Sequence, residues 1–191
     1  EQQTMFETVL RSRGRNILEN LPADKKAMVI LGRPYNTGDP ALNLRLVEKL
    51  INLNTIPIPL DFLPLHEENI FEDYRMMYWP NGQKILAASR LIRKNKNLFG
   101  VYMGNFRCGP DSFLTHYVRG EMKGKPYLHL EVDEHSADAG LVTRLEAFLD
   151  SLRSKGDPLA DAVIAELAES MPLTDVGDLL AEVRRRVGMV F

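Results

Sequence analysis

Short apolar runs alternate with stretches of helical spacing through most of the chain. Four runs predict strands, because each is continuous or nearly so, as in a parallel sheet that is covered on both faces. They span residues 27–31, 55–58, 98–103 and 127–132. Pro57 and Pro59 lack backbone donors, so we expect the second run at or near a sheet edge. The alternation predicts an α/β fold, an open parallel sheet of about four strands with flanking helices.

Apolar residues spaced three or four positions apart predict the helices between these runs. The helical segments are 4–20, 42–53, 81–95, 111–122 and 139–152, with two more at 159–169 and 176–187. Residues 61–80 mix acidic and aromatic side chains, and we expect a long connection there with one or two short helices. The chain then divides into an N-terminal helix at 1–24, an α/β domain at 25–155 and a C-terminal helical appendage at 156–191.

The composition narrows the classes of function. With 191 residues and 45% hydrophobic content, the chain can bury a substantial core. Its net charge of −2 gives no electrostatic reason to propose nucleic acid or an anionic membrane as a partner. No apolar run approaches the roughly 20 residues that span a bilayer, and the first residues lack a secretory signal pattern. We expect a cytoplasmic protein and, because the sequence opens without Met on a helical pattern, part of a longer one.

The loop after the third predicted strand holds the single cysteine, Cys108. Cys108 lies between Arg107 and a Gly-Pro turn, just before a predicted helix whose N-terminus favours negative charge. These neighbours favour a thiolate that acts as a metal ligand or nucleophile over a buried structural cysteine. Zinc and iron–sulfur sites take about four ligands, so a metal here needs ligands from outside the chain. Asp111 is at the position where a helix N-cap is expected, and this capping role alone explains an aspartate there.

The loop after the first predicted strand, residues 32–40, is rich in turn formers. Its glycines and the helix that follows are suited to a phosphate or another anion, although neither nucleotide-binding glycine motif is present. Arg33 favours anion binding over a plain turn, because a guanidinium pairs well with a carboxylate or phosphate. Tyr35 and Asn36 in the same loop are candidate substrate- or anion-binding residues.

The loop after the fourth predicted strand carries Asp133, Glu134 and His135. These side chains are candidates for acid–base groups or metal ligands, against the alternative of a solvated turn. Because parallel strands end at one edge of a sheet, we expect loops 32–40, 104–111 and 133–138 to converge there, with Cys108 partly exposed.

Three segments in this order resemble a known family: GRPYNTGDPALN, FRCGPDSF and DEHSADAGLVTRLEAFLD. They are similar to the large fused relatives of the 2-hydroxyacyl-CoA dehydratase activases, in which an ATPase activase region is joined to a dehydratase-like region. The resemblance covers residues 25–152 and places them in the C-terminal part of the dehydratase-like region. It implies a Rossmann-like fold, a [4Fe–4S] cluster held by cysteines between two such domains, and ATP-driven electron transfer at low potential.

Under this resemblance Cys108 matches the cysteine of the family's CGPD elbow, a cluster ligand, and the other cysteines lie in a preceding region. The chain is then half of an iron–sulfur module of a dehydratase-like or reductase-like enzyme for acyl-CoA or another small substrate. Its partners are an upstream cysteine-bearing domain and an ATP-dependent activase domain. We expect the cluster in the intact protein, and neither cluster nor activity in this fragment alone. Arg33 and His135 would tune the cluster or hold a substrate. The candidate substrate- or anion-binding residues are Arg33, Tyr35, Asn36, Arg107, Asp111, Asp133 and His135.

Two other interpretations stay open from the sequence. In the first, the chain is a non-catalytic binding or docking module that takes an anion such as a CoA phosphate at loop 32–40. In the second, it is a stand-alone enzyme with Cys108 as nucleophile, although no convincing base partner is present.

Overall fold

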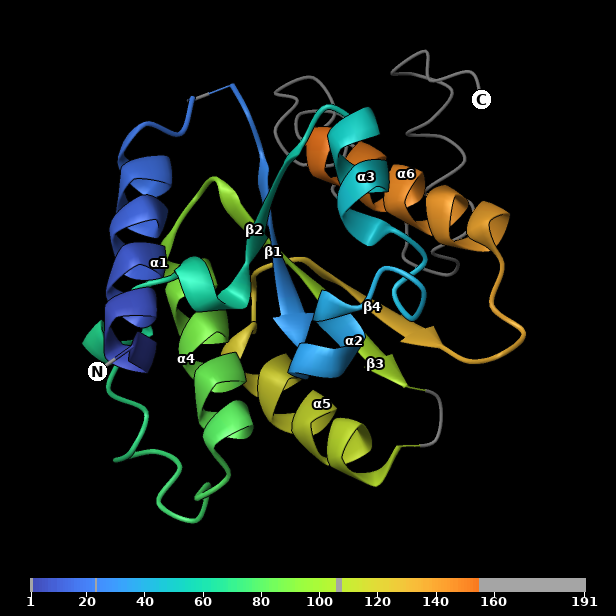
Figure 1. The fold of residues 1–191 in the computed structure, drawn as a ribbon. Coiled ribbons are helices and arrows are strands. Elements are labelled where there is room, and N and C mark those ends of the chain that lie inside the picture. Colours follow the sequence, from blue (N-terminus) through green and yellow to red (C-terminus); the bar gives the residue numbers. More distant parts are fainter. Residues whose placement is uncertain (1, 23, 106–107, 155–191) are drawn as a thin grey trace, which may run out of the picture. The chain divides into compact units, whose positions relative to one another are not determined.

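The computed structural model describes residues 2–22, 24–105 and 108–154 (Figure 1). The predicted appendage at 156–191 and Arg107 therefore lie outside the described residues. Internal contacts divide the chain at Leu145, and the fold below is that of the unit Glu1–Leu145.

A four-stranded parallel sheet forms the centre of this unit (Figure 1). The strands run in the order β2-β1-β3-β4, and every neighbouring pair is parallel. The predicted α/β fold with an open, Rossmann-like parallel sheet is thus confirmed. The strand bounds are β1 Ala27–Gly32, β2 Ile56–Pro59, β3 Leu98–Asn105 and β4 Tyr127–Val132.

The burial of each strand follows from its residues. All six residues of β1 are buried, as its unbroken apolar run predicts for a strand with neighbours on both sides. Ala27 lies in register with Ile56 of β2 and with Leu98 of β3. The strand β2 forms one edge of the sheet, where its two prolines are tolerated because one side needs no ladder bonds.

The helices agree with the predicted segments, with two differences. Loop 32–40 contains a short helix, because Pro34 suits a first helical position. The helix expected from residue 42 begins only at Leu46, since Leu44 and Arg45 adopt left-handed backbone angles. No helix in the described part of the chain is long and apolar enough to cross a membrane. The helix bounds are α1 Gln2–Glu19, α2 Pro34–Gly38, α3 Leu46–Asn52, α4 Pro80–Lys94, α5 Gly109–Glu121 and α6 Asp138–Ser154, with short 3-10 turns η1 Leu60–Phe62 and η2 Leu65–Glu67.

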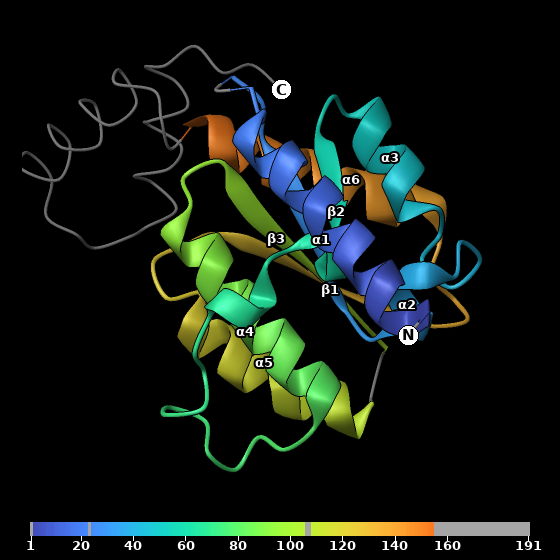
Figure 2. The ribbon, with the colours of Figure 1, turned by 60° about the vertical axis from the view of Figure 1, so that its left-hand side comes forward.

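Helices cover both faces of the sheet (Figures 1 and 2). The helices α4 and α5 pack side by side on one face, and α1 lies against η1 on the same side. The helix α3 and the first turns of α6 lie on the other face, where Lys49 pairs with Asp138 at 3.1 Å. The core under α4 and α5 includes Val29, Leu31 and Tyr102, each almost fully buried.

The direction in which the chain adds strands to the sheet reverses between β1 and β3. The chain leaves β1 for β2 on one side, then returns past β1 to β3 on the other. In open parallel sheets this switch point leaves a crevice beyond the carboxyl ends of the two strands. Loops 32–40, 104–111 and 133–138 follow β1, β3 and β4, so the predicted convergence at one edge is confirmed for their described residues.

Candidate functional site

A buried ion pair joins the two loops at the switch point. Arg33 directly follows β1, and Asp111 lies in the first turn of α5, beyond β3. Arg33 Nη2 and Asp111 Oδ2 are 2.7 Å apart, and their side chains are 10% and 3% exposed. Charge-assisted hydrogen bonds are about twice as strong as neutral ones, so this pair fixes one loop against the other.

Asp111 has two further donors, and both come from β3. The backbone N–H of Asn105 donates to Asp111 Oδ2 at 2.9 Å, and the Tyr102 hydroxyl donates to Oδ1 at 3.3 Å. The expectation that Asp111 is the helix N-cap is wrong, because Cys108 holds that position. The Asp111 side chain is instead buried and accepts hydrogen bonds from β3 and from the loop after β1.

This environment sets the charge states of Arg33 and Tyr102. Burial opposes the charge of Arg33, but the hydrogen bond and negative charge of Asp111 outweigh it and raise its pKa above the ordinary value. Burial, reinforced by the Asp111 carboxylate, raises the pKa of Tyr102 well above the ordinary tyrosine value. Tyr102 is therefore a neutral hydroxyl donor and Arg33 a permanent cation at neutral pH.

The Arg33 guanidinium donates hydrogen bonds to both Cys108 and Asp111. Arg33 Nη2 lies 2.9 Å from Cys108 Sγ and donates to it. The thiol is partly exposed, as predicted. Its backbone is anchored as well, with Cys108 N donating to Asn105 O at 3.1 Å and Ser112 N donating to Cys108 O at 2.9 Å. The sulfur is thus held as a hydrogen-bond acceptor beside a fixed cation, an arrangement complementary to a thiolate, the form that binds metals.

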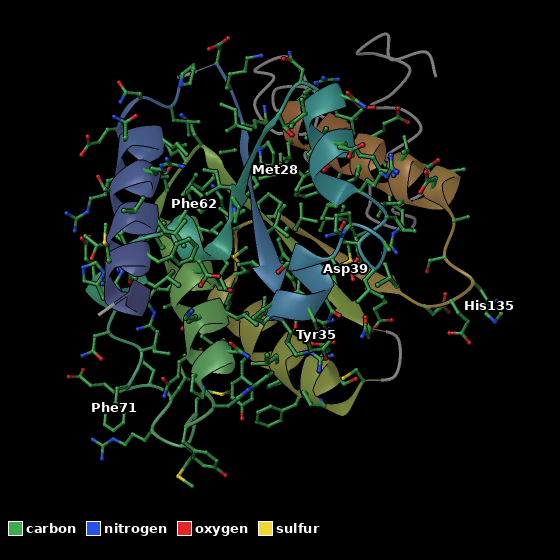
Figure 3. The ribbon with its side chains drawn as sticks, in the orientation of Figure 1. Met28, Tyr35, Asp39, Phe62, Phe71 and His135 are labelled. Carbon is green, nitrogen blue, oxygen red and sulfur yellow. The ribbon has the colours of Figure 1, made fainter. Side chains whose placement is uncertain are left out.

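Tyr35 and Asn36 flank Arg33 in different ways. The Tyr35 ring lies 4.6 Å from the guanidinium carbon in a cation–π contact and is half exposed (Figure 3). Asn36 is fully buried, and its amide has no hydrogen-bond partner among the described residues. Tyr35 therefore packs against Arg33, whose charge is already engaged by Asp111, whereas Asn36 is enclosed in the interior.

The turn after β4 is self-contained. Asp133 Oδ1 accepts hydrogen bonds from His135 N at 3.0 Å and from Ser136 Oγ at 2.9 Å. The Ser136 hydrogen bond is the main cause that lowers the pKa of Asp133. The His135 side chain is 85% exposed and lies 3.7 Å from Glu134. Figure 3 shows His135 on the outer side of this turn, well away from Tyr35. The structure therefore does not bring these side chains to Cys108.

The donor set at Cys108 is too small for a complete metal centre. Across residues 2–22, 24–105 and 108–154, no group of three or more His, Cys, Asp or Glu side chains is placed to hold a metal. Cys108 offers a single sulfur ligand, with Arg33 and Asp111 as its support. These residues can supply one ligand to a shared cluster, but they are too few to bind a cluster with this part of the chain alone.

The role of Tyr102 was not predicted from the sequence, in which this residue lies only inside a buried strand. A tyrosine among aliphatic residues was the available signal, because a buried tyrosine hydroxyl usually finds a hydrogen-bond partner. The role of the Asn105 backbone had no such signal, since any residue type offers the same N–H group.

Comparison with known proteins gives one family match. Residues 1–63 match the family model described as CoA enzyme activase uncharacterised domain (DUF2229). Neither the curated proteins nor the solved structures include a significant match to this chain. The matched residues run from α1 to η1 and include Arg33, whereas Cys108 and Asp111 lie beyond them. The N-terminal third of the chain is thus similar to a domain of CoA enzyme activases, which supports the activase-related part of the resemblance.

Proposed function

We propose that this chain is part of an activase-related protein in which Cys108 supplies one thiolate to a [4Fe–4S] cluster shared with another domain. The observation that carries the proposal is the 2.9 Å hydrogen bond from Arg33 to Cys108 Sγ. It is supported by the burial of the Arg33–Asp111 pair and by the family match over residues 1–63. Ligand sulfurs of iron–sulfur clusters are commonly hydrogen-bonded, and such bonds help to set the reduction potential.

Each residue of the site has a defined part in this proposal. Cys108 is the ligand, and Arg33 orients its sulfur and stabilises its negative charge. Asp111 and Tyr102 hold Arg33 in place, so that the guanidinium does not swing into solvent. When bound, the cluster supplies one-electron transfer. The remaining thiolates come from an upstream cysteine-bearing domain, and ATP-dependent electron delivery comes from an activase domain.

The substrate in this proposal is an acyl-CoA or another small molecule, and the compartment is the cytoplasm, where thiols stay reduced. The alternative of an anion-binding module at loop 32–40 has less support. Arg33 already pairs with a carboxylate, and Asn36 is fully buried. A phosphate at this loop would have to displace Asp111 from the guanidinium.

The test uses the intact protein purified without oxygen, with and without the substitution Cys108→Ala. Iron and sulfide content and the EPR spectrum of the reduced protein are measured. We expect Cys108→Ala to lower the iron content or change the spectrum, because a cubane loses one of about four thiolates. Asp133→Ala, at the same edge of the sheet, serves as the matched control and should leave both unchanged. An unaltered spectrum in Cys108→Ala would remove Cys108 as a ligand and favour the binding module.

A further inference from the structure

The amino edge of the sheet, opposite the Cys108 site, gathers most of the lysines of the chain. Because β1, β3 and β4 are parallel neighbours, the segments that precede them meet at this edge (Figure 1). Each of the three segments carries two lysines, which makes six of the nine in the sequence. We call this set the lysine edge; its members are Lys25, Lys26, Lys94, Lys96, Lys123 and Lys125.

Hydrogen bonds tie the three segments together. Ala27 N donates to Asn97 O at 2.9 Å, which joins the start of β1 to the start of β3. Lys125 Nζ donates to Asn95 O at 2.6 Å and to Lys96 O at 3.0 Å, which joins the start of β4 to the same segment. With strands about 4.8 Å apart, the starts of β1 and β4 are about 10 Å from each other. The three segments that carry the six lysines therefore lie side by side along this edge.

Few acidic groups balance this surface. Asp24 is the one acidic residue in the three segments at 24–26, 93–97 and 122–126. Lys94 pairs with Glu68 at 2.7 Å, but Lys26, Lys96 and Lys123 have no acidic partner among the described residues. Lys96 and Lys123 are also exposed. The net charge of −2 for the whole sequence therefore conceals a concentrated positive surface.

Lys125 makes several contacts within the lysine edge. Its ammonium lies 4.3 Å from the centroid of the Phe99 ring, in addition to its two carbonyl acceptors. Burial lowers the pKa of Lys125. The cation also covers the Phe99 face, so this ring is not free to stack on another group.

We infer that the lysine edge is a docking surface for an acidic protein surface. Small ligands bind in concave sites, and none of the six lysines lines the described cavities around α1, α4 and the β1–α2 loop. Nucleic-acid surfaces combine such charge with arginine forks or open aromatic faces. Here Arg93 pairs with Glu121 at 3.7 Å, and Phe99 is covered. Flexible lysines without acidic partners are suited to bind carboxylates. Such complementary charges raise the association rate and help to select the partner.

The test measures binding of a short, fluorescent poly-L-glutamate peptide to the full chain by anisotropy. The variant Lys96→Glu/Lys123→Glu is compared with Arg45→Glu/Arg75→Glu, which makes the same change in net charge at exposed arginines elsewhere. We expect the lysine variant to bind at least about tenfold more weakly. The arginine variant should stay within about twofold of the unchanged chain, because screening confines the effect to nearby charges. Circular dichroism and the milder Lys96→Gln/Lys123→Gln variant separate lost binding from lost folding.

Every other outcome overturns the inference. Equal losses in the two charge-reversal variants would show a response to net charge alone. No binding of the peptide at low salt would show that the lysine edge does not recognise carboxylates. Tighter binding of a single-stranded oligonucleotide of equal charge, lost in the lysine variant, would assign the surface to nucleic acid.

Discussion

Two polar loops at the same edge of the sheet, one after β3 and one after β4, differ in what their side chains contact. The first reaches across elements, since Asp111 accepts hydrogen bonds from Arg33 beyond β1 and from two positions on β3. The second closes on itself, with Asp133 bound to Ser136 and to the backbone of His135. Both loops contain an aspartate, and both occupy the same place in a strand-loop-helix unit.

The difference follows from the neighbours of the two strands. The strand β3 lies between β1 and β4, so its loop meets another loop at the switch point of the sheet. The strand β4 is at the end of the sheet, and its loop has a neighbour on one side only. A polar residue at a strand end becomes part of a composite site when a second loop supplies a partner, and otherwise it satisfies itself or stays in water.

The largest expected effect comes from breaking the buried pair in the first loop. Asp111→Ala leaves the Arg33 cation buried without its carboxylate, and we expect a loss of about 3–5 kcal/mol in the free energy of unfolding. Asp133→Ala, its counterpart in the second loop, should cost no more than about 0.5 kcal/mol, because the turn is exposed. Urea denaturation of both variants gives the two values.

A double variant checks the cause of that loss. Arg33→Met/Asp111→Leu removes both charges and fills the space with apolar side chains, so it should be more stable than Asp111→Ala. A double variant less stable than the single one would show that Asp111 acts through packing and not through the charge of Arg33.

A smaller effect is expected from crowding beneath the same pair. A Cβ added at Gly104 would lie 3.3 Å from Tyr102 Cε1, which is tight, and 3.5 Å from Asp111 Cβ, which is an ordinary van der Waals contact. We expect Gly104→Ala to cost about 1–2 kcal/mol. Gly109→Ala, where a Cβ meets nothing within 4 Å, is the matched control and should change stability by less than about 0.5 kcal/mol. Equal costs at both glycines would contradict tight packing between Gly104 and Tyr102.

The Tyr102 hydroxyl should contribute less again. Tyr102→Phe keeps the ring in the core and removes the 3.3 Å hydrogen bond to Asp111 Oδ1. Because Oδ2 keeps its two donors, we expect a loss of about 1 kcal/mol. The same change combined with Asp111→Ala should cost no more than Asp111→Ala alone, and a fully additive loss in denaturation experiments would mean that the hydroxyl acts elsewhere.

Much of the fold could be predicted from the sequence, because local patterns determine it. The apolar run at β1 predicts a buried strand, and Pro57 and Pro59 predict that β2 lies at an edge. The short helix α2 and the late start of α3 were missed, since left-handed backbone at Leu44 and Arg45 has no signal in those residue types. Propensity favours helix at both positions, and the packing of the loop overrides it.

The site was predictable only as a set of candidates. Arg33, Cys108 and Asp111 are each recognisable as polar residues at strand or helix ends. Their pairing depends on the strand order, which brings β1 beside β3, and the sequence does not contain that order directly. The order alone leaves two candidates, because the loops after β1 and β4 both flank the loop after β3, and the side-chain contacts select Arg33 as the partner of Cys108.

The smallest expected effect concerns pH and His129, a residue of β4 that contacts Tyr102 of β3. Its ring meets Tyr102 edge to face at 5.2 Å, and its Nε2 is buried without a hydrogen-bond partner among the described residues. Burial lowers the pKa of His129, and Arg144 and Arg119 act in the same direction, while the carboxylates of Glu131 and Asp111 oppose them.

The sign of the pH effect follows from this lowered pKa. The unfolded chain takes up a proton at about pH 6.5, whereas folded His129 resists it until the pH is lower. The stability linked to His129 is therefore fully present above about pH 6.5 and decreases as the pH falls toward the folded pKa. We expect unfolding free energies to decrease below pH 6.5 more steeply for the unchanged chain than for His129→Phe, which keeps the aromatic contact with Tyr102 but cannot titrate. Parallel pH curves from urea denaturation would show that His129 takes up its proton equally in both states, and would separate it from the buried network of Asp111 and Tyr102.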